Sequence, residues 1–213
     1  RDVAVTGVQT CALPIYDQVQ AITTAGIKGL SVDQVSNLTT TQVQALTSGQ
    51  VLALTADQIV GLTTAQVSKL TEDQIKVMST AQIKVIATDD MKALTATQMQ
   101  AITTDGIKAL TVDQMAVITT LQVSNLLDTQ VSKLNVTQLQ ALASDSLRAL
   151  TETQVQAITT TGIKGLALDQ VANLTTKQIA ALSTSQLVSL TASQDRKSTR
   201  LNSSHGYISY AVF

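Results

Sequence analysis

Aliphatic residues recur along this chain with a strict period of eight. From Ile22 to Leu190 the sequence divides, without insertion or deletion, into 22 octads such as LTADQIVG and LTTAQVSK. Position 1 of the octad is Leu, Ile or Met in all 22, and position 6 is Val, Ile, Leu or Met from Ile27 to Leu187. A repeat this regular indicates an array of small identical structural units.

Two polar positions are nearly as constant as the aliphatic ones. Position 2 is Thr, Ser or Asn in 18 of the 22 octads, and position 5 is Gln in 17. The exceptions at position 2 are Ala87, Leu127, Ala143 and Ala167, and those at position 5 are Gly26, Asp90, Gly106, Ser146 and Gly162.

The pattern L-T-x-x-Q-V predicts the start of a helix. In a capping box, a Thr hydroxyl accepts a hydrogen bond from the amide three residues later, and a Gln there reaches back to the amide of the Thr. The Leu before the Thr and the Val after the Gln match the hydrophobic staple that accompanies such a start. We therefore predict an all-α solenoid of very short capped helices, one per eight-residue repeat, over residues 16–194.

Two other backbone conformations fit the period less well. In one continuous helix, eight residues overshoot two turns by about 80°, so the aliphatic positions would spiral around the surface. In a simple strand, positions 1 and 6 would point to opposite faces. A β-solenoid that turns a corner inside each octad remains an alternative.

Charge placement favours the helical interpretation. Of the 13 acidic residues in 17–194, 12 lie at positions 3 or 4, and nine of the ten basic residues lie at positions 7 or 8. Acids in the first turn and bases in the last turn are favoured by the helix dipole.

Helices this short are marginal in isolation, so their stability must come from stacking octad on octad. Small residues at position 8 are expected to let neighbouring helices approach closely; they include Ala45, Ala53, Gly61, Ala101 and Gly165.

A slower repeat overlies the octads. Residues 20–34, 100–114 and 156–170 are near copies, and the last two lie seven octads apart. Gly replaces the capping-box Gln in each copy, which should weaken that helix start and permit a bend. Simple drift in a tolerant repeat explains these glycines equally well.

The two ends of the chain have a different origin from the repeat. Codons can be written for residues 1–15 whose reverse complement encodes residues 195–209, residue for residue. Residues 1–15 and 195–213 also resemble translated sequencing adapters. We expect both segments to be adapter-derived and not native, with residues 16–194 forming a solenoid that is incomplete at both ends.

Composition removes most chemistry from the repeat region. Residues 17–194 contain no Cys, His, Pro, Trp, Tyr or Phe, and their ten Lys/Arg against 13 Asp/Glu give a net charge of about −3. We expect no catalytic, cofactor-binding or metal site, no nucleic-acid partner and no membrane insertion. The acidic pairs Glu72-Asp73 and Asp89-Asp90 are interpreted as first-turn helix charges.

The octad consensus L-T-x-x-Q-[VI]-x-[AGS] resembles the octapeptide repeats of very large bacterial surface and adhesin-like proteins. The resemblance implies a non-catalytic spacer or stalk, extracellular or at the cell surface, as a monomeric segment of a longer chain with a protein or surface ligand unknown. Two alternatives stay open: an intracellular α-solenoid that serves as a protein-interaction scaffold, and a β-solenoid with an ice-binding-like array of Thr.

Overall fold

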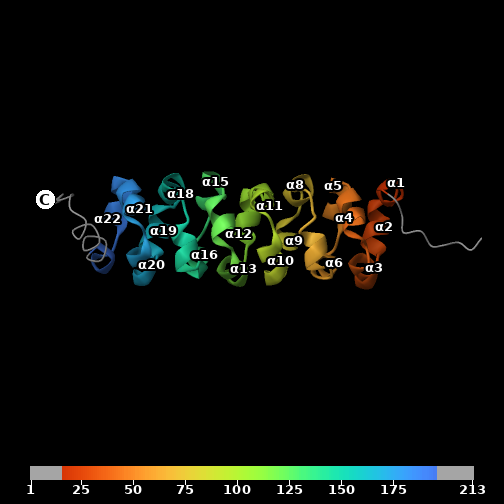
Figure 1. The fold of residues 1–213 in the computed structure, drawn as a ribbon, viewed down its shortest axis with the longest axis horizontal. Coiled ribbons are helices and arrows are strands. Elements are labelled where there is room, and N and C mark those ends of the chain that lie inside the picture. The colour runs from red at the N-terminus through yellow and green to blue at the C-terminus, as the bar shows by residue number, and fades with distance from the viewer. Residues whose placement is uncertain (1–15, 196–213) are drawn as a thin grey trace, which may run out of the picture.

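The fold is a straight rod of short helices (Figure 1). The computed structural model describes residues 16–195, so the predicted adapter-derived segments lie outside the described residues except for Asp195. All regular structure within 16–195 is helical, without a strand, which makes the β-solenoid alternative wrong for this part of the chain.

Each octad contributes one very short helix, as predicted. The helices defined in the described residues are α1 (Tyr16–Gln20), α2 (Thr24–Gly29), α3 (Val32–Ser36), α4 (Thr40–Ala45), α5 (Ser48–Ala53), α6 (Ala56–Val60), α7 (Thr64–Val67), α8 (Glu72–Lys76), α9 (Thr80–Lys84), α10 (Thr88–Ala93), α11 (Ala96–Ala101), α12 (Thr104–Ala109), α13 (Val112–Val117), α14 (Thr120–Ser124), α15 (Asp128–Val131), α16 (Val136–Ala141), α17 (Ser144–Arg148), α18 (Glu152–Ala157), α19 (Thr160–Gly165), α20 (Leu168–Asn173), α21 (Thr176–Ala181) and α22 (Thr184–Ser189).

The capping box opens most of these helices. At the start of α6, the Gln58 backbone amide donates to Thr55 Oγ1 at 3.2 Å, and the Thr55 backbone amide donates to Gln58 Oε1 at 2.8 Å. Thr55 itself is extended, with φ −75° and ψ 164°, as an N-cap residue should be. The predicted helix start is confirmed.

The link between helices is very short. Leu54, at position 1, ends α5 with φ −59° and ψ 135°, and its amide donates to the Val51 carbonyl at 3.2 Å. Thr55 follows in the extended conformation and α6 begins at Ala56. Any L-residue adopts these angles, which explains why the repeat contains no regular Gly or Pro turn.

Stacking follows one rule throughout the rod. Each helix packs against the third helix further along the chain, from α1 on α4 to α19 on α22. Side-chain hydrogen bonds, described below, connect most helices to the fourth helix along. Because each helix contacts the third and the fourth helix along the chain, one superhelical turn contains between three and four helices. Helices seven apart therefore lie on the same side after two turns, as α1, α8 and α15 do along one edge in Figure 1 and α6, α13 and α20 along the other.

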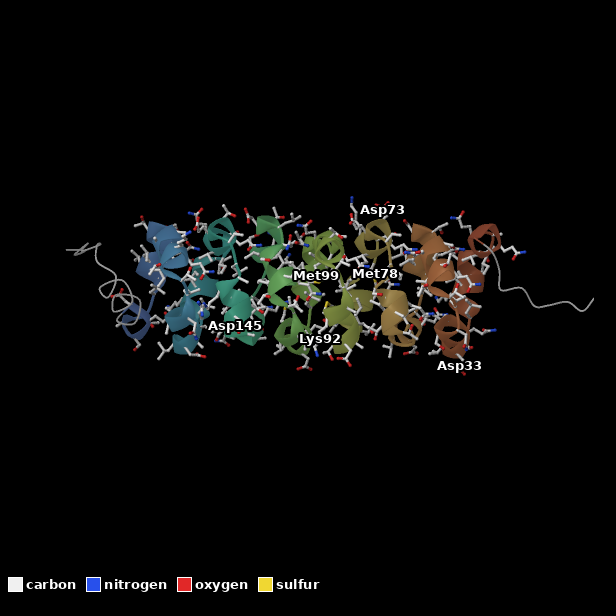
Figure 2. The ribbon with its side chains drawn as sticks, viewed as in Figure 1. Asp33, Asp73, Met78, Lys92, Met99 and Asp145 are labelled. Atoms are coloured by element: carbon white, nitrogen blue, oxygen red, sulfur yellow. The ribbon has the colours of Figure 1, made fainter. Side chains whose placement is uncertain are left out.

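A single aliphatic core runs along the axis of the rod. Position 6 supplies its most buried members, such as Val51, Ile107 and Leu139, all 0% exposed, and position 1 lines it with Leu and Ile. Figure 2 shows Met78 and Met99 near the axis of the rod, and Asp33, Asp73 and Lys92 toward its edges. Asp145 is also exposed.

Small residues at position 8 do permit close packing at two of the predicted sites. A Cβ on Gly61 would lie 2.3 Å from a Val32 methyl carbon, and one on Gly165 would lie 2.5 Å from a Val136 methyl carbon. Both pairs join helices three apart, so a β-branched residue on one helix is accommodated by glycine on the other.

Helix starts survive where the capping residues are replaced. At α12 and α19 the Thr hydroxyl still accepts from the amide of Gly106 or Gly162, so only one of the two capping bonds is lost. At α15 and α20 the Gln side chain still accepts from the amide of Leu127 or Ala167, so one capping bond remains. At α10 and α17, which follow Ala87 and Ala143, the helix begins in the same register without either bond. Stacking therefore holds the register where a cap is absent.

We expect Leu139→Ala to destabilise the fold by about 2–5 kcal/mol, because it opens a cavity in the axial core. Leu121→Ala removes the same side chain from a position that is 65% exposed and should change stability by less than about 0.5 kcal/mol. Urea unfolding followed by far-ultraviolet circular dichroism measures both. Equal effects of the two substitutions would contradict a core built on position 6.

Candidate functional site

The most constrained polar side chain of the repeat is the buried Gln at position 5. Gln58 in α6 is 2% exposed, and its side-chain amide uses both ends. Oε1 accepts from the Thr55 amide at its own helix start. Nε2 donates to the carbonyls of α2 and its C-cap, at 2.9 Å to Ile27, 3.4 Å to Lys28 and 2.7 Å to Leu30.

This second set of contacts repeats along the rod, and we call it the glutamine clamp. In each case Nε2 reaches three carbonyls at the end of the helix four octads back, equivalent to those that Gln58 contacts in α2. The clamp has all three contacts at Gln50, Gln58, Gln66, Gln74, Gln82, Gln98, Gln114, Gln122, Gln130, Gln138, Gln154, Gln170, Gln178 and Gln186.

The clamp satisfies groups that a very short helix cannot satisfy by itself. The last four carbonyls of any helix lack an intrahelical partner, and in helices as short as these they are most of the carbonyls. Buried without a donor, each would cost about 1–3 kcal/mol. One neutral amide therefore caps the start of its own helix and the end of another.

Sequence reasoning predicted the first of these roles and missed the second. The sequence contained a signal for the second role. Glu serves in a capping box as well as Gln does, yet position 5 never contains Glu. A Glu carboxylate can accept from the N-cap amide but cannot donate to carbonyls. The exclusion of Glu thus reflects the donor role of Nε2.

The clamp is interrupted where Gln is replaced. Gly106 and Gly162 offer no side chain to the ends of α8 and α15. Ser146 keeps one contact, since its hydroxyl donates to the Ile118 carbonyl at 3.1 Å. Asp89 and Asp90 lie in the first turn of α10, as interpreted from the sequence. Asp89 is exposed, whereas Asp90 is 4% exposed.

Outside the clamp, the described residues present little chemistry. No group of three or more His, Cys, Asp or Glu residues within 16–195 could hold a metal ion. The ion pairs between described residues join Lys92 to Asp89 at 3.4 Å and Lys108 to Asp105 at 3.3 Å, both on the exposed surface of single helices. No helix among residues 16–195 has the length and apolarity needed to cross a membrane.

The surface between stacked helices carries shallow open grooves. One is lined by Thr80, Lys84, Lys108, Val112, Asn135 and Thr137, from helices α9, α12, α13 and α16 and the residues beside them. Its walls combine Thr hydroxyls with Lys ammonium groups and enclose no buried polar cluster. Such a surface offers no nucleophile beside a general base.

Comparison with known proteins supports the repeat assignment. The ALTTAQ repeat family matches this chain over residues 16–48 and again over 83–120. The two matched segments contain the same octad elements, including the Thr or Ser caps and position-5 side chains of α3 and α13. The chain is thus similar to a family defined by repeats, and its all-helical repeat fold is consistent with a protein that is not an enzyme. No curated protein matches the chain.

We expect Gln114→Glu to separate the two roles of the clamp. Glu preserves the length of the side chain and its acceptor for the Thr111 amide, but replaces the donor to Ile83 and Ile86 with a charged acceptor. The loss of stability should be roughly 3 kcal/mol, from unsatisfied carbonyls and a buried charge.

Gln156→Glu is the matched control, because Gln156 lies at exposed position 7 of α18. Thermal unfolding of the two variants at pH 7 gives the comparison. If Gln114→Glu has the same melting temperature as the wild type, the donor role of Nε2 has no energetic importance.

Proposed function

We propose that this chain is a non-catalytic spacer, part of the stalk of a large bacterial surface protein of the adhesin-like kind. The observation that carries the proposal is the glutamine clamp, which joins most helices to the helix four octads along the chain and to no more remote part of it. A rod built this way lengthens by whole octads without any change in its cross-section.

Three further features support a spacer. The octad register is unbroken from Ile22 to Leu190, so the rod has no internal domain boundary. Its core is one continuous aliphatic cluster rather than a closed globule. Thr, Ala, Gln and charged side chains dominate the described surface. Large exposed aliphatic residues, such as Leu52 and Leu121, are few.

The spacing of the last two near copies, residues 100–114 and 156–170, fits growth by whole superhelical turns. Residues 86–141 form a block of seven octads, and the octads from Leu142 onward repeat its register, with Asp90 and Ser146 at equivalent positions. Seven octads complete about two turns, so each added block presents its residues on the same side of the rod as the block before it.

Deletion of residues 86–141 should shorten the rod without unfolding it. We expect the maximum dimension from small-angle scattering to fall in proportion to the residues removed, with an unchanged cross-sectional radius and unchanged helical signal per residue. Deletion of residues 86–137, which breaks the octad register, is the control and should lose helical signal. A compact particle in the first case would contradict the spacer function.

Surface location requires a separate experiment in cells that produce the protein. Antibodies against the repeat should label intact cells as strongly as permeabilised cells, and added protease should remove the signal. Labelling only after permeabilisation would instead favour an intracellular interaction scaffold.

A further inference from the structure

Asp90 places an acidic side chain where the repeat requires a donor. It lies at position 5 of α10 and is 4% exposed. Its carboxylate forms no hydrogen bond or ion pair within the described residues, and its oxygens keep contact with solvent at the edge of the core. The register of the clamp sets this position against the end of the helix four octads back, where the carbonyls of Ile59, Val60 and Leu62 close α6.

Those carbonyls have lost their donor. The Val60 and Leu62 carbonyls accept no hydrogen bond from the described residues, whereas the equivalent carbonyls of α2 receive Gln58 Nε2 at 3.4 and 2.7 Å. They also lie at the negative end of the α6 dipole. A carboxylate placed against them is an unfavourable arrangement of oxygens unless a positive group lies between them.

The equivalent residue of the next block shows that this place is within reach of a short side chain. Ser146, seven octads after Asp90, donates to the Ile118 carbonyl, the counterpart of Leu62, at 3.1 Å. An Asp side chain is one methylene shorter than Gln, by about 1.5 Å. Asp90 therefore lacks both the methylene and the Nε2 donor with which Gln contacts these carbonyls elsewhere in the rod.

We propose that Asp90 and the carbonyls of Ile59 and Leu62 bind a calcium ion, which takes the place of the Gln amide nitrogen. Calcium prefers ligands of this kind, carboxylate and backbone carbonyl oxygens at about 2.3–2.6 Å, with water completing its shell. With a single carboxylate, the site belongs in the weak class, with a dissociation constant on the order of 10⁻⁴–10⁻³ M. The ion would connect α10 to α6 as the glutamine clamp connects other helices.

The test is thermal unfolding of the full chain, freed of divalent ions with a chelator and then titrated with CaCl₂. The wild type should show a saturable rise in melting temperature. Asp90→Gln, which restores the consensus residue, should melt higher than the calcium-free wild type and show no response to calcium. Ser146→Asp should introduce a second calcium response at the end of α13.

Two controls exclude general effects of the ion. Asp89→Asn removes the exposed neighbouring carboxylate and should leave the calcium response unchanged. MgCl₂ at the same concentrations should give a smaller rise, because magnesium demands stricter octahedral geometry.

The proposal is overturned if calcium has no effect on the wild type, or if it shifts wild type and Asp90→Gln equally. It is also overturned if the Asp90-dependent difference in melting temperature varies with pH alone and not with calcium, since a proton would then serve in place of the ion.

Discussion

The buried side-chain amide of position 5 is the interaction on which this fold depends. A helix this short consists almost entirely of ends, so its stability is decided by what satisfies its unpaired amides and carbonyls. In Gln58, Oε1 accepts a hydrogen bond from the Thr55 amide at the start of α6, and Nε2 donates to carbonyls at the end of α2. Because the Gln must lie three residues after the cap and also reach a helix four octads away, an insertion of one residue would break both contacts. This double requirement explains why the register is preserved without exception.

The same interaction determines the shape of the molecule. Contacts with the third and fourth units along the chain resemble the contacts of residues within a single α-helix, carried to the scale of whole helices. Every contact is local in sequence, so the rod has no preferred length and no closed core. A protein that separates two objects by a fixed distance requires these properties, and they arise here from aliphatic packing and neutral hydrogen bonds rather than from cross-links.

Much of this architecture could be predicted from the octad alone. The Thr and Gln of L-T-x-x-Q-V predicted helix starts because the capping box is local, and the segregation of acids and bases indicated the same period independently. The number of helices per turn could not be predicted in this way, because it depends on how helices three and four octads apart cross. The glutamine clamp was missed for the same reason: Nε2 acts between helices four octads apart, and the octad pattern does not show which octads are in contact. Knowledge of that stacking is needed to interpret the absence of Glu at position 5, the pairing of Val32 with Gly61 and the seven-octad spacing of the last two near copies.

Hydrogen exchange of the glutamine side-chain amides, observed by ¹H–¹⁵N nuclear magnetic resonance, tests the central claim most directly. The Nε2 hydrogens of clamped residues such as Gln58 and Gln114 should exchange orders of magnitude more slowly than those of exposed Gln156, and about as slowly as the backbone amides of position 6. Rapid and uniform exchange of all Gln side chains would show that no buried amide joins the helices, and would contradict the account.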